Sequence, residues 1–310
     1  MATRNGDYMI LNGKLVPFAE ARIHCLSPAI TSSVNVFEGL RAYWNPEDEQ
    51  LHVFRLEEHL ARLEYSARVM RIGAHPWDRD TLREMVCELL RVNEARESVH
   101  MRIHLYVDED GFMTATEPVG MFISCVFRPS TRQSREGCTA QVSSWTRLTD
   151  NSGPPRVKSS ANYFNGRLAA IQAKQDGYDN AILLTPEGHV SEGPGACIFL
   201  IRDGVPSTPD RSQHILESIT RDTLITGFSE WFGNPVQERA IGRSELYAAQ
   251  EVFFCGTGNE ITPVIGIDGL AVGEGRVGPI TAALQERYFA IASGRDAAHP
   301  EWRTPVYGRP

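Results

Sequence analysis

The sequence predicts a protein of the α+β class, because short strand-like runs and helical stripes occur mixed along the whole chain. In the helical stripes apolar residues recur every three or four positions, whereas the strand-like runs alternate or are continuously apolar. The 310 residues are 42% hydrophobic and 23% charged, ordinary globular proportions that leave enough apolar surface for a packed core. We expect one large domain or two medium ones.

The chain opens with a predicted β-hairpin. Two short apolar runs flank Asn12-Gly13, and an Asn-Gly pair between such runs is the strongest short-range signal for a hairpin. A helix is expected from Leu56, since apolar residues recur at helical spacing as far as Met70, and Gly73 then stops the pattern. The first domain therefore combines strands with helices.

A second helix is expected after Thr81, where Thr81-Leu-Arg-Glu84 matches a capping box. A strand is expected at residues 100–107. Its apolar positions are Met101, Ile103, Leu105 and Val107, and its polar positions are His100, Arg102, His104 and Tyr106. Because successive side chains of a strand point to opposite faces, the polar face is a candidate lining for a functional site.

A polar stretch at residues 128–137 separates two strand-like runs and contains both proline and glycine, a composition typical of a linker. We therefore place an N-terminal α/β domain at residues 1–127, an interdomain linker at 128–137 and a C-terminal domain at 138–310. The elements expected in the C-terminal domain are a helix around Phe164, Leu168 and Ile171 that ends near Gly177, buried strands at 181–185 and 197–201, a helix after Thr220, and a final helix from Pro279. The tail at 295–310 is expected either to pack on the surface or to fray.

Composition and charge argue against several classes of function. A formal charge of −8 disfavours a nucleic-acid partner, because proteins that bind a phosphate backbone usually present a basic surface. The first residues lack an apolar core with a cleavage site, and no apolar run is long enough to cross a bilayer. The six cysteines are scattered singly, which suggests neither a metal site nor a disulfide framework. We expect a cytoplasmic protein that works on small molecules.

Lysine is rare in this chain. Only Lys14, Lys158 and Lys174 occur among the 31 lysine and arginine residues, so 28 are arginine. A primary amine that can lose its proton and condense with an aldehyde is something arginine cannot supply. Lys14 in a turn and Lys174 at a helix end have ordinary explanations. Lys158 lies between an irregular segment and a helix start, where it fits either an exposed loop residue or a reactive amine.

Seven short segments occur in a fixed order along the chain. They are Val36-Phe-Glu-Gly-Leu-Arg41, Phe54-Arg through His59-Leu-Ala-Arg62-Leu, Lys158 to Tyr163, Gly177-Tyr-Asp, Val190-Ser-Glu192-Gly, Ile219-Thr-Arg-Asp222 and Gly256-Thr-Gly-Asn-Glu-Ile-Thr-Pro263. Together and in this order they resemble the class IV, or fold-type IV, pyridoxal-phosphate aminotransferases, nearest to the branched-chain amino acid aminotransferases. The resemblance runs through nearly the whole chain.

The resemblance implies a two-domain fold of the D-amino acid aminotransferase-like type, with pyridoxal 5'-phosphate between a smaller N-terminal domain and a larger C-terminal domain. The implied reaction moves an amino group from an amino acid or amine to a 2-oxo acid by a ping-pong Schiff-base mechanism. Family members are homodimers in which the partner contributes a loop to each pocket, and residues 108–118 match that loop. We therefore expect a homodimer that binds no metal, nucleic acid or membrane.

The resemblance also assigns catalytic roles. Lys158 matches the lysine that forms the Schiff base, and Tyr163 matches the tyrosine that hydrogen-bonds the phenolic oxygen of the cofactor. Glu192 matches the carboxylate that keeps the pyridine nitrogen protonated, which makes the ring an electron sink. Without the resemblance, Tyr163 fits a buried helix tyrosine equally well, and Glu192 fits a solvated loop acid.

Binding roles follow in the same way. The implied phosphate site consists of Arg62, Ile219, Thr220 and Thr257. Glu217-Ser-Ile-Thr220, immediately before the helix expected after Thr220, suits it because the backbone N–H groups at a helix N-terminus bind anions. The implied substrate site consists of Phe37, Arg41, Arg102, Thr257 and Gly258. Arg102 falls on the polar strand face, which agrees with that role, whereas a structural ion pair explains Arg41 equally well.

Three positions depart from branched-chain enzymes and predict an altered pocket. Ser32 stands where an aromatic residue is usual, His100 replaces a common tyrosine, and Arg128 lies in a segment that normally contains tryptophan. The alternatives on the same fold are a D-amino acid or (R)-amine transaminase and an aminodeoxychorismate-type lyase, because fold does not choose among them. A non-catalytic cofactor-binding module is a further alternative.

Overall fold

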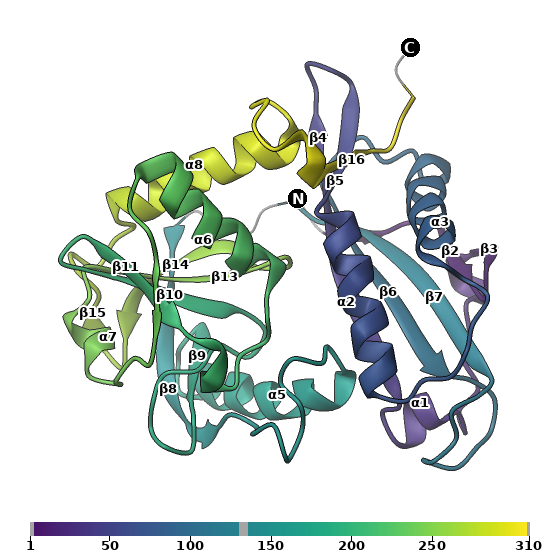
Figure 1. The fold of residues 1–310 in the computed structure, drawn as a ribbon, viewed down its shortest axis with the longest axis horizontal. Coiled ribbons are helices and arrows are strands. Elements are labelled where there is room, and N and C mark those ends of the chain that lie inside the picture. The colour runs from purple at the N-terminus through teal and green to yellow at the C-terminus, as the bar shows by residue number, and fades with distance from the viewer. Residues whose placement is uncertain (1–2, 130–135, 309–310) are drawn as a thin grey trace. The chain divides into compact units, whose positions relative to one another are not determined.

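The computed structural model describes residues 3–129 and 136–308. They form two compact units (Figure 1): a first unit at residues 3–129, 157–161 and 288–308, and a second unit at residues 136–156 and 162–287. Part of the expected linker, residues 130–135, lies outside the described residues, and the linker boundary stays a prediction. Within the described ranges, no helix combines the length and apolar character that a membrane crossing requires.

The first unit is built on an antiparallel sheet of eight described strands in the order β16-β5-β4-β6-β7-β2-β3, with β1 paired to β7. These strands are β1 (Arg4–Asn5), β2 (Tyr8–Leu11), β3 (Lys14–Pro17), β4 (Asn35–Asn45), β5 (Gln50–Phe54), β6 (Val99–Val107), β7 (Val119–Phe127) and β16 (Arg303–Pro305). The expected hairpin is confirmed as β2 and β3. Asn12 (φ 48°) and Gly13 (φ 78°) are both left-handed, as the tightest hairpin turns require.

Two helices cover this sheet. Helix α2 (Leu56–Val69) packs on β4, and α3 (Arg79–Val92) packs on β2 and β7; the short elements η1 (Phe18–Glu20) and α1 (Pro28–Thr31) precede β4. The capping box expected at Thr81 is wrong. The helix starts earlier, because the Asp78 carboxylate accepts a hydrogen bond from the Thr81 backbone N–H (2.9 Å) and so satisfies a donor of the first turn.

The core of the first unit lies on one face of the sheet. The four apolar positions of β6 are fully buried there together with Leu60 and Leu63 of α2 and Val86 and Leu90 of α3. The strand predicted at residues 100–107 is therefore confirmed, and its polar positions lie on the opposite face.

The second unit contains a mixed sheet of eight described strands in the order β12-β11-β10-β13-β14-β8-β9, with β15 paired to β14. The pairs β11/β12, β8/β14 and β8/β9 are parallel. These strands are β8 (Cys138–Thr146), β9 (Asn180–Leu184), β10 (Cys197–Arg202), β11 (Val205–Pro209), β12 (Gln237–Arg239), β13 (Glu251–Gly256), β14 (Glu260–Ile267) and β15 (Leu270–Ala271). Both buried strands expected in this half are thus confirmed, as β9 and β10.

The helices expected in the second half also form. They are α5 (Ser160–Gln175), α6 (Ile219–Phe232) and α8 (Pro279–Ser293). The structure adds three short elements that were not predicted: η2 (Arg211–Gln213), α7 (Glu245–Ala248) and η3 (Pro300–Trp302). In α5 the apolar side chain of Phe164 is 65% exposed, and the buried positions are instead small or amide residues such as Gly166 and Ala169. A Cβ at Gly166 would lie 2.5 Å from the Pro194 carbonyl oxygen, so the helix approaches that loop closely.

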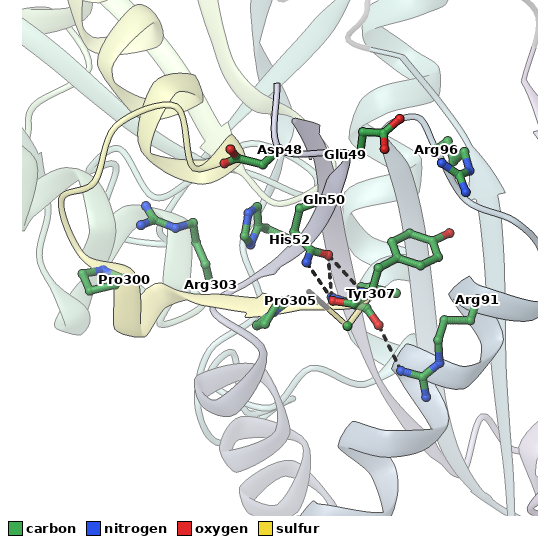
Figure 2. Close-up of a pocket in the computed structure, with 12 residues that line it drawn as sticks. Asp48, Glu49, Gln50, His52, Arg91, Arg96, Pro300, Arg303, Pro305 and Tyr307 are labelled. Carbon is green, nitrogen blue, oxygen red and sulfur yellow. Dashed lines mark hydrogen bonds between the residues drawn. The ribbon is translucent and has the colours of Figure 1, made fainter. Parts of the chain in front are cut away.

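The C-terminal tail packs as a strand. Residues 303–305 pair with residues 52–54 of β5 to form the edge strand β16. Gln50 then fixes the next residues: its Oε1 accepts hydrogen bonds from the backbone N–H groups of Val306 and Tyr307 (3.2 and 2.9 Å), and its Nε2 donates to the Tyr307 carbonyl (2.8 Å). Figure 2 shows this side chain directed at the tail backbone.

Candidate functional site

The polar face of β6 forms the floor of a candidate site in the first unit. Directly opposite residues of an antiparallel pair share a face, so three rows of side chains cross this floor from β4 through β6 to β7. The rows are Phe37-His104-Phe122, Gly39-Arg102-Ser124 and Arg41-His100-Val126. Arg102 therefore stands between a glycine and a serine, which leaves its exposed guanidinium uncovered by its cross-strand neighbours.

Lys158 is tied to the edge of β4 beside this floor. Its backbone carbonyl accepts a hydrogen bond from the Phe37 N–H (2.9 Å), and its own N–H donates to Ser66 Oγ of α2 (3.2 Å). The Nζ atom lies 5.0 Å from the centre of the Phe37 ring. The structure thus brings together two residues predicted for the site, Lys158 and Phe37.

Arg62, another predicted residue, lies on α2 and reaches a buried carboxylate on β4. Its Nε and Nη2 atoms donate to Glu38 Oε1 and Oε2 (2.7 and 2.8 Å), and His59 Nδ1 lies 2.7 Å from Oε2. Burial acts to raise the pKa of Glu38, but the positive charge and hydrogen bonds of Arg62, together with His59, outweigh it and bring the pKa down to about 2. Glu38 is therefore ionised at neutral pH.

Several positive charges surround His100 on the floor. Burial lowers its pKa first, and the charges of Arg102, Arg41, Arg128 and Lys158 lower it further, to about 3. The imidazole is neutral at pH 7, and the charges around it favour an anionic group such as a carboxylate. Arg41 itself is buried, and its Nη2 donates to the Arg128 backbone carbonyl (2.9 Å).

The second unit holds the remaining predicted residues around Glu192. This buried carboxylate forms an ion pair with Arg147 (Oε1 to Nη2, 2.7 Å), and its Oε2 accepts a hydrogen bond from the Leu216 N–H (3.1 Å). The Cys197 thiol donates to the same oxygen at 3.8 Å. The Glu192 carbonyl accepts from the Leu183 N–H of β9 (2.9 Å), which fixes the residue at a strand edge. The solvated-acid alternative for Glu192 is thereby excluded.

Tyr163 and the turn after β13 both contact the loop that follows Glu192. A Cβ at Gly195 would lie 3.6 Å from Cε1 of the Tyr163 ring. In the turn that holds Thr257 and Gly258, the Asn259 side chain donates to the Gly195 carbonyl (3.2 Å). The structure therefore gathers Glu192, Tyr163 and the β13–β14 turn around one loop.

The N-terminus of α6 supplies backbone donors in the same unit. Ser218 caps this helix, since its Oγ accepts from the Arg221 N–H (3.3 Å) and its carbonyl accepts from the Asp222 N–H (3.0 Å). The amides of Ile219 and Thr220 precede these two and have no acceptor inside the helix, because the first N–H groups of a helix point out of its end. They remain suited to an anion.

Sequence reasoning missed four residues of these networks: Glu38, His59, Arg147 and Cys197. Glu38 and His59 lie inside two of the quoted motifs, and a carboxylate in an otherwise apolar strand was a usable signal. Arg147 follows β8 in a segment without a pattern, and Cys197 looks like an ordinary buried thiol. Their roles depend on contacts between residues distant in sequence.

The first unit also carries a pocket of about 1180 Å³ at the tail strand. Figure 2 shows the side chains that line it. They are Asp48, Glu49, Gln50, His52, Arg91, Arg96, Pro300, Arg303, Pro305, Val306, Tyr307 and Gly308. None of the residues predicted for the site lines this pocket.

Comparison with known proteins gives consistent matches over nearly the whole chain. The family model for amino-transferase class IV matches residues 35–267. A probable branched-chain-amino-acid aminotransferase of Aquifex aeolicus is 40% identical over 307 residues, which cover 98% of each chain. The branched-chain-amino-acid aminotransferase of Escherichia coli K12 is 35% identical over 313 residues, 99% of each chain.

Solved structures of branched-chain aminotransferases also match this chain over nearly its whole length. The branched-chain amino acid aminotransferase of Thermobaculum terrenum in its PLP form has a TM-score of 0.91 and 39% identity, and the match covers 98% of this chain and 99% of that one. The branched-chain aminotransferase of Thermoproteus uzoniensis with norvaline has a TM-score of 0.90 at 38% identity, with 97% of this chain and 100% of that one covered.

Proposed function

Because the chain belongs to the class IV aminotransferases and is a pyridoxal-phosphate-dependent transaminase, we propose that Lys158 is the residue that holds its cofactor. When bound, pyridoxal 5'-phosphate supplies an aldehyde for the amine and a ring that takes up negative charge as the substrate loses its Cα proton. The observation that carries the proposal is the position of Lys158, tied to β4 and α2 beside Phe37. In this proposal the Lys158 Nζ atom is also the base that accepts the proton from the substrate Cα.

The donors of both units fit this cofactor. Glu192 is a buried carboxylate, which suits a protonated ring nitrogen, and Arg147 balances its charge. The N-terminal amides of Ile219 and Thr220, the Thr257 hydroxyl and the Arg62 guanidinium match what a phosphate requires. Tyr163 supplies a phenol to hydrogen-bond the phenolic oxygen of the ring.

We further propose that the pocket admits an amino donor with a polar, acidic or bulkier side chain. Arg102 on the floor, with the backbone amides of Thr257 and Gly258, would hold the substrate carboxylate, while Phe37 and Arg41 line the approach. An apolar pocket favours branched side chains through burial, about 25 cal/mol per Å². His100 and the arginines near it replace part of such a surface with polar groups. This supports a transaminase that discriminates less strongly for leucine, isoleucine and valine.

We also propose a homodimer in the cytoplasm. In the loop at residues 108–118, Phe112 and Met113 are 87% and 72% exposed, and exposed apolar side chains of this kind favour burial against a partner. All six cysteines are free thiols, as is usual for proteins of reducing compartments.

The role of Lys158 is tested by substitution and chemical trapping. Lys158→Ala should abolish cofactor attachment and nearly all turnover, whereas Lys174→Arg at the end of α5 is the matched control and should leave both unchanged. Reduction of the wild-type enzyme with borohydride and peptide mass analysis should place the reduced cofactor on Lys158. Recovery of the adduct on Lys174 or Lys14 would overturn the assignment.

Donor choice is tested by kcat/KM across branched, acidic, aromatic and simple chiral amines and the D-enantiomers, with 2-oxoglutarate or pyruvate as acceptor. We expect an acidic or polar L-donor to equal or exceed leucine. A leucine or isoleucine value about tenfold above every other donor, or about 1.4 kcal/mol of barrier, would restore an ordinary branched-chain pocket. Preference for a D-donor or an (R)-amine, or pyruvate release without an acceptor, would instead indicate one of the alternative activities.

A further inference from the structure

We propose that Glu38 is a positioning residue for the cofactor phosphate. It binds one edge of the Arg62 guanidinium and so orients the opposite edge of that guanidinium toward the phosphate. The inference rests on the proposed function, in which Arg62 binds that phosphate. Glu38 does not touch the cofactor in this scheme. It acts through Arg62.

The geometry of the Arg62–Glu38 ion pair fixes the plane of the guanidinium as well as its distance from the carboxylate. Nε and Nη2 of Arg62 donate to the two oxygens of Glu38 at 2.7 and 2.8 Å. Two parallel bonds between a planar guanidinium and a planar carboxylate hold both groups nearly coplanar. A guanidinium has five N–H donors, and those on its far edge point away from Glu38 in a direction that this pairing sets.

The surroundings of Glu38 make the pairing obligatory. The carboxylate is fully buried on the helix-facing side of β4, where its strand neighbours on that side, Val36 and Leu40, are fully buried as well. A buried charge that loses its partner is strongly destabilising, whereas an apolar pair of the same size can be as stable as an ion pair. Stability alone therefore does not explain why a carboxylate stands at this position. The orientation of Arg62 explains it.

His59 holds the second oxygen of Glu38 without adding charge. Its Nδ1 lies 2.7 Å from Oε2, and burial lowers the pKa of the imidazole, with the Glu38 hydrogen bond opposing that shift. A neutral imidazole whose Nδ1 carries the proton donates to the carboxylate. The Glu38 side chain is thus fixed at both oxygens.

Helix α2 relates this network to Lys158. His59, Arg62 and Ser66 follow one another at three- and four-residue spacing and so share one face of the helix. Ser66 Oγ accepts the Lys158 N–H at 3.2 Å, while Arg62 and His59 reach Glu38. One helix face therefore sets the position of the proposed phosphate ligand relative to the lysine that holds the other end of the cofactor.

The test separates the phosphate from the rest of the cofactor. Full-length protein stripped of cofactor is titrated with pyridoxal 5'-phosphate and with pyridoxal, which lacks the phosphate, and the ratio of the two Kd values is measured. Glu38→Gln should weaken binding of pyridoxal 5'-phosphate on the order of 10-fold, by analogy with partners that orient metal-binding side chains, and leave the Kd for pyridoxal unchanged. Glu38→Asp keeps the charge and should lie between Glu38→Gln and the wild type.

Two further variants make the outcome specific. Arg62→Gln should remove the preference for the phosphorylated ligand; if it does not, the proposed role of Arg62 is wrong. Glu251→Gln alters another buried carboxylate, which accepts from the N–H groups of Ile280 and Thr281 (3.0 and 2.7 Å), and should lower Tm without changing the ratio.

The positioning role is overturned if Arg62→Gln changes the ratio but Glu38→Gln does not, or if Glu38→Gln weakens both ligands equally. Should Glu38→Gln fail to fold, the ratio measured for Glu38→Asp decides: an unchanged ratio overturns the role, and a reduced one supports it.

Discussion

His104 stands between two phenylalanine rings on the polar face of β6. Its ring centre lies 5.0 Å from that of Phe37 and 4.3 Å from that of Phe122, and both pairs are stacked. Burial, and to a smaller extent the charge of Arg102, lowers the pKa of His104 to about 3. The imidazole is thus part of an aromatic ladder that supports Phe37 beneath Lys158.

This ladder predicts a pH dependence of stability. In the unfolded chain His104 titrates near its usual 6.5 and in the folded protein near 3, so the unfolded state binds more protons between these values. Stability therefore falls as pH drops below 6.5. His104→Leu removes this pH dependence. Between pH 7.5 and pH 5 the free energy of unfolding of the variant should therefore fall by about 2 kcal/mol less than that of the wild type.

The measurement is urea unfolding of both proteins at the two pH values. Equal losses in the wild type and in His104→Leu would show that His104 does not titrate with unfolding and would contradict the prediction.

At the scale of single residues, alternation along the strand was enough to place His100, Arg102 and His104 on one face. It was not enough to identify Arg147 or Glu38 as partners. Arg147 is paired with Glu192, which lies far from it in the sequence, and such a pairing depends on how β8 and β9 are arranged rather than on any local pattern. Residue types near a site are readable from sequence, whereas ion pairs between distant segments are not.

Among the elements, the tail that follows β16 is held in part by side chains of β5 and α3. Gln50 accepts two backbone hydrogen bonds from the tail and donates one to it, and Arg91 Nη1 donates to the Val306 carbonyl (3.0 Å). Figure 2 shows these contacts converging on the residues just after β16. The tail is therefore held by side-chain hydrogen bonds in addition to strand pairing.

Gln50→Ala should loosen the tail without unfolding the first unit. It leaves the Tyr307 amide without its acceptor, at a cost of about 1–3 kcal/mol for a buried group, whereas the Val306 amide also donates to the Leu51 backbone carbonyl (2.9 Å) and keeps that acceptor. Hydrogen exchange of the Tyr307 amide should accelerate, while exchange of the Val306 amide and of the β6 amides stays slow. Gln50→Glu keeps an acceptor oxygen and should have the smaller effect; unchanged exchange at Tyr307 in Gln50→Ala would refute this account of the tail.

Element types were easier to predict than their ends. The hairpin, α2, β6, β9, β10 and α8 follow from apolar spacing and turn residues, but the start of α3 depends on a choice between Asp78 and Thr81 as the cap, and both are good caps. Residues 303–305 were not predicted as a strand because they are short and include Pro305. An edge strand tolerates such a residue, and only the pairing with β5 reveals it.

At the scale of the whole molecule, each unit is assembled from separated stretches of chain. The first unit includes residues 157–161 and 288–308 in addition to 3–129. Residues 157–161 therefore interrupt the second unit in the sequence. No local pattern in the sequence shows this, because membership is decided by pairings such as β16 with β5 and the contact of Lys158 with Phe37. The family resemblance predicted the fold class correctly, and the course of the chain through it required the structure.

This interleaving governs the order in which the parts can be completed as the chain leaves the ribosome. Residues 3–129 emerge before the segment that carries Lys158, and well before the strand that closes one edge of their sheet. The edge of β5 that will receive β16 stays open until residues 303–305 have been made, and open strand edges are where nascent chains pair wrongly. The first unit is therefore completed only after the second unit has been synthesised in full. The proposed cofactor lysine, Lys158, belongs to a unit whose last strand is made near the end of synthesis.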